Sequence, residues 1–342
     1  MRNKELLWFR LFNANGFGLK SVHYLFDILR SKGQTIEDLF AYDERQFCET
    51  FPEIGHGKFS KATFRSVHQT ENDGRLFSTF EQLKDERVYV IGLDDERYPK
   101  GVLNTMNGNS PSVLFCRGNL RLLNNKGISI VGAREVDDFA VLLTKEIAKN
   151  LAYNGYNVTS GYAKGVDTNA HIGALEADGT TTMILSFGVN HISIKRELKE
   201  LNWERNALFV TQFAPYEKFS GQNAMTRNKL VCAMSQALIV IQSGPERDSE
   251  GKMSGTFDAG KSALEMGIPI FVLSPKVLSN AKGNIDLIRH GGMEFEHGNQ
   301  IIEYLNSNLE KESKVSSLTG NLSMTGKPKL QPASVTSQLT LF

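Results

Sequence analysis

From Arg87 onward, short apolar runs alternate with longer segments whose apolar positions recur at helical spacing. The runs are Val88–Ile91, Ile128–Val131, Asn157–Thr159, Thr182–Leu185, Leu208–Val210, Leu238–Ile241 and Ile270–Leu273. Most of them contain no polar residue, as expected for strands covered on both faces. Helical segments lie between them at Asp137–Asn154, Val166–Ala177 and Thr256–Met266. The alternation predicts an α/β domain with a doubly wound, mostly parallel sheet and a ligand site at the carboxyl ends of its strands.

The first part of the chain, residues 1–82, has a helical pattern without strands, and we expect it to form a small helical domain. Two glycine turns interrupt it, at Asn15–Lys20 and Ile54–Lys58. Each leads into a helix, as in helix-hairpin-helix modules, where backbone N–H groups and a lysine meet a DNA phosphate. The alternative is an ordinary helix connector in which glycine supplies the positive φ angle. A helical domain follows in either case.

The end of the chain, residues 306–342, differs from both. Lys311–Pro332 is rich in Ser, Thr, Gly and Lys and has no apolar period, which predicts a disordered linker. The predicted organisation is therefore a helical domain at 1–82, the α/β domain at 83–305 and a flexible tail at 306–342.

Composition indicates a soluble cytoplasmic protein. The start is charged, and no stretch approaches the roughly 18 apolar residues that span a membrane. Cys48, Cys116 and Cys232 are far apart, as expected for reduced thiols without a metal site. The formal net charge is only +1, from 39 basic and 38 acidic residues. Any nucleic-acid binding must therefore come from positive charge concentrated on one face.

Four segments near predicted strand ends combine glycine, hydroxyl and cationic residues. They are Gly132–Arg134, Ser160–Asp167, Thr226–Lys229, leading into a helix, and Ser254–Thr256, opening another. Close backbone approach, N–H donors and a cation are what a phosphate group requires. The dinucleotide fingerprint G-x-G-x-x-G and the Walker sequence are both missing, so the loops suit phosphates in a chain better than NAD or ATP. We expect no cofactor.

The segment Ser160–His171, SGYAKGVDTNAH, resembles the SG-x-A-x-G-[IV]-D-x-x-AH signature of the DNA-processing protein A family (DprA/Smf). The family's further motifs occur in order: Tyr98-Pro99, Pro111–Asn119, Val131–Arg134, Gly179-Thr180, Arg227–Lys229, Ser254-Gly255 and Gly283–Ile288. The resemblance covers residues 88–295. Lysine stands where the family usually has arginine at Lys164 and Lys229, which keeps the charge but loses the bidentate fork.

The resemblance implies an extended Rossmann-like fold that binds single-stranded DNA without cutting it. It further implies a homodimer that protects incoming strands and loads a RecA-type recombinase during DNA uptake or processing. The predicted DNA contacts are Arg134, Ser160, Gly161, Lys164, Gly165, Arg227, Asn228, Lys229, Ser254, Gly255 and Thr256. We expect Asp167 and His171 to cap the helix and fix the loop, without a catalytic role.

Two other functions fit the same loops. Related nucleotide phosphoribohydrolases (the LOG type) carry G-G-x-G-T-x-x-E, but here Ala259 stands where the acid should be and Asp258 is one residue out of step. Without that carboxylate, no obvious group stabilises an oxocarbenium ion or activates water. A sensor of small nucleotides is the other alternative.

The chain ends in QLTLF, which resembles the pentapeptide that binds the bacterial sliding clamp. Gln338 would anchor by hydrogen bonds while Leu339, Leu341 and Phe342 fill apolar pockets, and the linker would give the tip its reach. The alternatives are a chance match or docking of the apolar tip on this protein's own surface.

Overall fold

The computed structural model describes residues 4–52, 61–125 and 127–307. Their helices are α1 (Lys4–Asn13), α2 (Leu19–Ser31), α3 (Ile36–Ala41), α4 (Glu44–Thr50), α5 (Lys61–Gln69), α6 (Gly74–Asp85), α7 (Lys100–Met106), α8 (Asp138–Tyr153), α9 (Val166–Glu176), α10 (Trp203–Asn206), α11 (Gly221–Ala233), α12 (Gly255–Glu265) and α13 (Lys282–Arg289). The strands are β1 (Val88–Gly92), β2 (Val113–Gly118), β3 (Gly127–Val131), β4 (Asn157–Gly161), β5 (Thr181–Ile184), β6 (Ala207–Thr211), β7 (Ala237–Val240), β8 (Ile270–Leu273) and β9 (Met293–Phe295).

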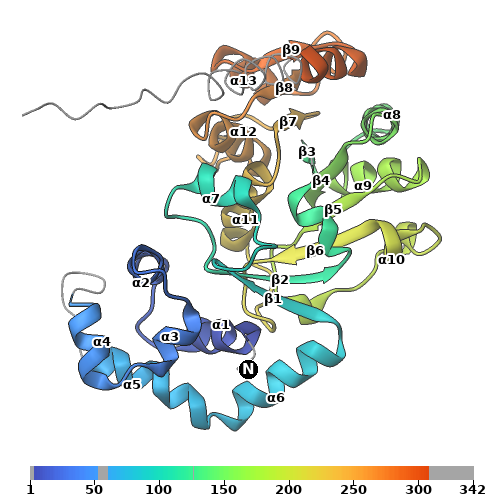
Figure 1. Cartoon of the computed structure of the whole chain (residues 1–342). Helices are drawn as coiled ribbons and strands as arrows, with labels where there is room; N and C mark the ends of the chain where they lie inside the picture. The colour runs from blue at the N-terminus through green and yellow to red at the C-terminus, as the bar shows by residue number, and fades with distance from the viewer. Residues whose placement is uncertain (1–3, 53–60, 126, 308–342) are drawn as a thin grey trace, which may run out of the picture. The chain divides into compact units, whose positions relative to one another are not determined.

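These strands form one sheet in the order β1-β2-β6-β5-β4-β3-β7-β8-β9 (Figure 1). The seven strands β6, β5, β4, β3, β7, β8 and β9, which are neighbours in that order, are parallel. At the β6 side of the sheet, β2 pairs antiparallel with β6, and β1 pairs antiparallel with β2. The chain leaves β3 toward β4 on one side and later returns to β7 on the other. The strand order therefore reverses between β3 and β7, which is where doubly wound sheets bind ligands.

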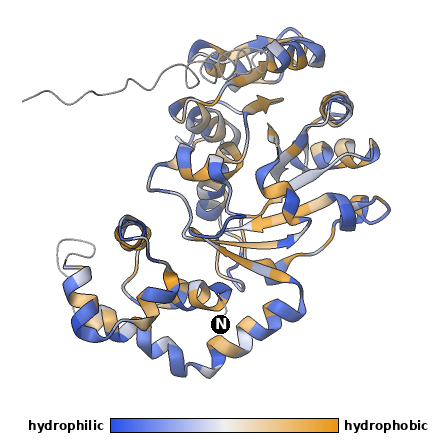
Figure 2. Cartoon of the chain, in the orientation of Figure 1, coloured by the Kyte–Doolittle hydropathy of each residue, from blue (hydrophilic) through white to orange (hydrophobic). Residues whose placement is uncertain are grey.

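The structure confirms the predicted fold class. Each apolar run became a strand, shifted by one residue at β5 and β7, and all residues of β3 to β8 are buried. The hydropathy colouring of Figure 2 shows these strands as the apolar centre of the sheet. The sequence pattern missed β2, which supplies much of the antiparallel edge, and the three-residue β9.

The helices cover both faces of the sheet. Figure 1 shows α8 and α9 on one face and α11 and α12 on the other. Helix α9 is buried almost along its whole length, because α8 packs directly over it. Gly173 permits this approach, since a Cβ there would lie about 2.5 Å from the Lys145 carbonyl oxygen. Asp137 caps α8 by accepting a hydrogen bond of 2.8 Å from the Ala140 N–H.

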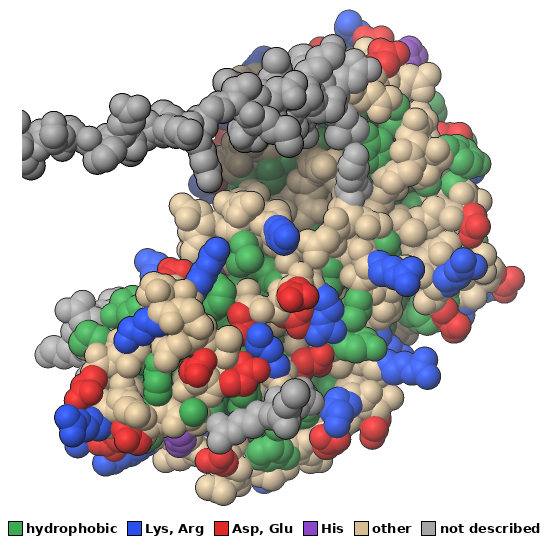
Figure 3. Space-filling model, in the orientation of Figure 1, with side chains coloured by type: hydrophobic (Ala, Val, Ile, Leu, Met, Phe, Trp, Pro, Cys, Tyr) green, Lys and Arg blue, Asp and Glu red, His purple; other side chains and the backbone are tan. Residues whose placement is uncertain are grey.

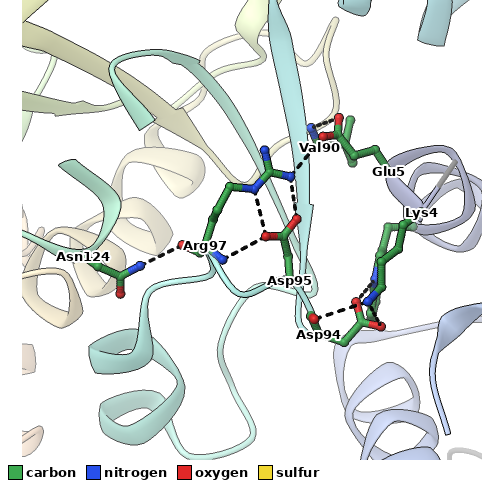
Figure 4. Close-up of polar contacts among 8 residues, drawn as sticks. Lys4, Glu5, Val90, Asp94, Asp95, Arg97 and Asn124 are labelled. Carbon is green, nitrogen blue, oxygen red and sulfur yellow. Dashed lines mark hydrogen bonds and ion pairs between the residues drawn. The ribbon is translucent and has the colours of Figure 1, made fainter. Parts of the chain in front are cut away.

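The amino-terminal helices share a continuous apolar core with the sheet, to which α1 contributes Phe9 and β2 contributes Phe115. A polar network also attaches α1 to the edge strand β1 (Figure 4). Glu5 accepts a hydrogen bond of 3.2 Å from the Val90 N–H and pairs with Arg97 at 3.1 Å. The carboxylate thereby satisfies a donor that an edge strand would otherwise leave open. The predicted domain boundary between residues 82 and 83 stays a prediction.

The described part of the chain divides after Gly298, and residues 299–307 beyond that point are helical. The predicted disordered tail therefore lies almost wholly outside the described residues. So does the second predicted glycine turn at Ile54–Lys58.

Candidate nucleic-acid interface

A cleft of about 830 Å³ opens at the carboxyl ends of β3 and β7, at the point where the strand order reverses. Its walls come from four separate segments: the turn after β3, the loop into α9 with the start of that helix, the first part of α11, and the chain from β7 into the start of α12. Hydrogen bonds join the turn to both neighbours. The Ala133 N–H donates to the Gln242 carbonyl at 2.9 Å, and the Val166 N–H donates to the Ala133 carbonyl at 3.1 Å.

The cleft brings together six of the eleven predicted DNA contacts. Its lining includes Arg134, Arg227, Asn228, Ser254, Gly255 and Thr256. The other five, Ser160, Gly161, Lys164, Gly165 and Lys229, do not line it. The predicted convergence of loops at one edge of the sheet is thus present, but the residues divide between those at the surface of the cleft and those that support it from behind.

The amino-terminal end of α12 supplies part of the cleft wall. Ser254 caps the helix, with its hydroxyl accepting from the Phe257 N–H at 3.4 Å. A helix N-terminus carries unpaired N–H groups and a partial positive charge, so Gly255 and Thr256 offer donors suited to an anion. Asn228 fixes this end, because its side-chain amide donates to the Gly255 carbonyl at 2.9 Å.

Gly161 and Gly165 shape the neighbouring loop. Gly165 has a φ angle of +72°, in the left-handed region that favours glycine. A Cβ at this position would also overlap with the carbonyl of Ala133. A Cβ on Gly161 would overlap with the Arg227 guanidinium, so that glycine makes room for a buried cation. Both residues therefore act by backbone approach, and not as surface groups.

Arg227 lines the cleft but is largely buried, and its contact with a ligand stays a prediction. It lies beneath Gly161 with 6% of its side chain exposed, and its Nη1 is 3.6 Å from Asp167 Oδ2. Asp167 also accepts from the Ala163 N–H at 3.3 Å. Burial lowers the pKa of Arg227, and the charge of Asp167 offsets part of that effect. The pair ties α11 to the loop before α9.

The segment Thr226–Lys229 is corrected, because it is not a loop that leads into a helix. It lies inside α11, which starts at Gly221 after its cap Ser220. Successive helical residues point about 100° apart, so the four side chains cannot share one surface. Arg227 and Asn228 line the cleft, whereas Thr226 and Lys229 line a different cavity of about 780 Å³, together with residues of α2 such as Leu19.

Ser160 and His171 belong to the buried support of the loop. The Ser160 hydroxyl donates to the Ile130 carbonyl at 2.6 Å, and none of the residue is exposed, so it does not face a ligand as expected. His171 Nε2 lies 2.6 Å from the Gly161 carbonyl and Nδ1 lies 2.6 Å from the Thr181 hydroxyl. Because a carbonyl only accepts, Nε2 carries the proton. Burial lowers the pKa of His171 to about 3, so it stays neutral near pH 7.

Four cations lie around the cleft and its loop: Arg134, Lys164 and Lys252 are exposed, and Lys195 is half-buried. Arg134 is exposed and its guanidinium carbon lies 5.6 Å from the centre of the Phe219 ring, while Lys164 is exposed on the loop. Lys195 was not predicted. Its Nζ donates to the Ala163 carbonyl at 2.7 Å and to the Thr168 hydroxyl at 2.5 Å. Burial lowers the pKa of Lys195 to about 8.

The carboxylates near the cleft bear on the phosphoribohydrolase alternative. Ala259 lines the cleft at the position where that enzyme class carries its acid. Asp258 is half-buried; burial raises its pKa, and the Asn228 amide lies 3.4 Å from its Oδ2. The cleft lining itself contains Glu135 and Asp167, the latter already paired with Arg227.

The predicted clamp-binding residues Gln338, Leu339, Leu341 and Phe342 lie outside the described residues. In the part of the chain that the structure describes, no helix is both long and apolar enough to cross a membrane.

The chain matches one sequence family and several of its characterised relatives. The model of the family described as DNA recombination-mediator protein A matches residues 89–306. Protein Smf of Escherichia coli is 27% identical over 231 residues, which are 66% of this chain and 59% of that protein. DNA processing protein DprA of Bacillus subtilis is 25% identical over 225 residues, 65% of this chain and 73% of that one. The chain thus spans little more than half the length of the first relative.

Solved structures agree with this match. DprA from Streptococcus pneumoniae superposes with a TM-score of 0.69 at 21% identity, over 89% of this chain and 98% of that one, which shows a shared fold. DNA processing protein A from Helicobacter pylori gives a TM-score of 0.53 at 25% identity, over 64% and 96%. The match to the family model spans the whole sheet from β1 to β9 together with the cleft. The chain belongs to the DNA recombination-mediator protein A family.

Proposed function

We propose that this chain binds the backbone of single-stranded DNA in the cleft between β3 and β7. The observation that carries the proposal is the convergence of an exposed arginine, Arg134, with the N-terminus of α12 across one cleft. Arg134 supplies a charge-assisted, bidentate partner for a phosphate, and Gly255 and Thr256 supply backbone donors. The buried pair of Arg227 and Asp167 holds the intervening loop in place.

Local charge explains how a nearly neutral protein would attract a polyanion. Figure 3 shows acidic and basic side chains interspersed over one face of the molecule, without a broad basic field. Binding therefore depends on the few cations at the cleft and its loop, Arg134, Lys164, Lys195 and Lys252. The solved Helicobacter pylori relative, whose structure concerns its single-stranded DNA binding mode, supports the same ligand class.

We further propose that binding occurs without catalysis. Splitting an N-glycosidic bond requires a carboxylate near the sugar, and Ala259 lines the cleft at the corresponding position. The family description supports a role as a recombination mediator. We further propose that the chain acts as a homodimer in the cytoplasm and loads a RecA-type recombinase on the bound strand. The sliding clamp is a proposed second partner through Gln338–Phe342.

The test is a salt titration of oligo-dT binding, with AMP as the competing small ligand. We expect micromolar or tighter binding whose logarithm falls with log salt by about 0.7 per phosphate contacted. Arg134→Ala should weaken binding and flatten the slope. The matched control is Lys276→Ala, since Lys276 is an exposed cation paired with Glu296 at 3.3 Å. Tight AMP binding without affinity for oligo-dT, or release of a base, would overturn the proposal.

Lys229→Ala serves as a second probe, because Lys229 opens into the neighbouring cavity and not into the cleft. If Arg134→Ala and Lys229→Ala reduce the affinity for oligo-dT equally, the bound DNA crosses α11 and contacts both the cleft and the neighbouring cavity. A loss for Arg134→Ala alone means that the strand stays within the cleft.

A further inference from the structure

A second groove, of about 570 Å³, gathers three arginines that are far apart in the sequence. Arg87 lies in the turn from α6 to β1, Arg117 lies near the end of β2, and Arg205 lies on α10. Arg87 and Arg205 are exposed and Arg117 is half-buried. Trp203 lines the same groove, with its ring 6.2 Å from that of Phe209.

The lining of this groove carries more positive than negative charge. Among the described residues, none of the ion pairs within 4.0 Å involves Arg87, Arg117 or Arg205. Glu86 and Glu204 also line the groove, where Glu86 accepts a hydrogen bond of 2.9 Å from the Gln82 amide, so three positive and two negative charges share the lining. Elsewhere on this protein, arginines such as Arg97 and Arg289 lie beside carboxylates. The arginines of the groove form no such pair, and the excess of positive charge in the lining favours an anion there.

The backbone at Arg87 supports a role for its side chain. Its φ angle is +57°, a left-handed conformation that a large side chain adopts at a cost of about 1 kcal/mol or more. Glycine or asparagine would fill this turn with less strain. Strain retained at a solvent-exposed arginine beside two other unpaired arginines points to the guanidinium group as the reason for the residue.

This groove is separate from the cleft. Strand β6 begins at Ala207 in the groove and ends with Thr211 at the carboxyl edge of the parallel strands. Five residues of strand span about 16 Å, so one nucleotide cannot reach both places. Single-stranded DNA of several nucleotides can reach both the groove and the cleft.

We propose that the groove of Arg87, Arg117 and Arg205 is a second nucleic-acid site that holds the phosphates of a single strand, with Trp203 offering a face for a base. The inference rests on the proposed DNA binding and adds a second contact for the same ligand class. Arginine matches phosphate oxygens in bidentate geometry, and indole rings stack on bases without regard to sequence. The groove volume suits one or two nucleotides and not a duplex.

The test compares a short oligo-dT of about 6 nucleotides with one of about 30 by fluorescence anisotropy, in Arg87→Gln/Arg205→Gln and wild type. The control is Arg45→Gln/Arg289→Gln, which removes the same charge from two exposed, paired arginines. We expect the groove variant to bind the long oligonucleotide about tenfold more weakly, with a salt slope flatter by about 1.4 for two lost phosphates. The short oligonucleotide, which the cleft alone can hold, should bind as in wild type.

Each other outcome decides the question. Equal binding of both variants to the long oligonucleotide overturns the second site while the proposed function stands. Failure of the wild type to bind either oligonucleotide overturns both. If the groove variant loses binding of free dTMP or pyrophosphate but not of the long oligonucleotide, the occupant is a small phosphate compound and not a strand. Photo-crosslinking of bromodeoxyuridine in the long oligonucleotide to Trp203 should appear in wild type and vanish in the groove variant.

Discussion

The buried pair of Arg227 and Asp167 makes a quantitative prediction for Asp167→Asn. The side chains are 6% and 8% exposed, and Asn keeps an oxygen that can accept from the Ala163 N–H. The substitution therefore removes the charge with little change in shape. It leaves the Arg227 guanidinium buried without an anion, in a place where burial already lowers its pKa. Breaking such a pair from one side costs about 3–5 kcal/mol, a large share of a typical total of about 5–15 kcal/mol.

The assay is equilibrium unfolding in urea, read from the midpoint at unchanged slope. Arg227→Met leaves Asp167 unpaired and should lose a comparable amount. The double variant Asp167→Asn/Arg227→Met removes both charges, so it should be markedly more stable than the sum of the single losses predicts. The reasoning is refuted if Asp167→Asn costs less than about 1 kcal/mol, the size of an exposed pair, or if the two losses simply add.

Three further predictions follow from the site and the tail. Oligo-dT affinity should fall between pH 7 and 9 as Lys195, whose pKa is lowered to about 8, loses its proton, and Lys195→Arg should remove this fall. His171 has its pKa lowered to about 3, so the unfolded chain takes up a proton below about pH 6.5 that the folded chain refuses. As the pH falls from about 6.5 toward 3, the free energy of unfolding should therefore decline by about 1.4 kcal/mol per pH unit because of His171. The urea midpoints of His171→Gln should depend less steeply on pH than those of the wild type. Deleting Gln338–Phe342 should abolish binding to the sliding clamp in calorimetry while leaving oligo-dT affinity unchanged; unchanged clamp affinity would remove that partner.

Apolar patterning was enough to predict strands β1 and β3 to β8 and helices α8, α9 and α12. Helix α8 was predicted as Asp137–Asn154, which differs from the observed element only by its two cap residues. The strands are predictable because parallel strands that are buried on both faces have uninterrupted apolar sequences. Strand β2 was missed although Val113–Cys116 is an apolar run, since it was interpreted only as part of a motif. Strand β9 has three residues, too few to show any period.

Site residues were predictable as a set but not in their orientation. The sequence shows which loops carry phosphate-suited residues, but it does not show which side chains fold inward. Ser160 turns its hydroxyl to Ile130 because a strand alternates its faces, and the neighbouring strand supplies the acceptor. The sequence pattern does not predict α11 at Thr226–Lys229, because the helix's first nine residues, GQNAMTRNK, are mostly polar and have no apolar period. Lys195 was missed because it meets Ala163 only through folding, 32 residues away along the chain.

The position of α11 decides how a DNA strand can contact both the cleft and the neighbouring cavity, which lie on either side of this helix. Arg227 and Asn228 face the cleft, and Lys229 faces the cavity beyond, because adjacent helical residues diverge by about 100°. A lysine there is a mobile point charge, whereas the buried Arg227 is fixed by Asp167 and cannot follow a ligand. The rigid elements thus set the shape of the cleft, and the exposed cations on its rim set the affinity. Substitutions of the buried residues Arg227 and Asp167 should therefore change stability and DNA binding together. Substitutions of the exposed Arg134 or Lys164 should change only DNA binding and its salt dependence.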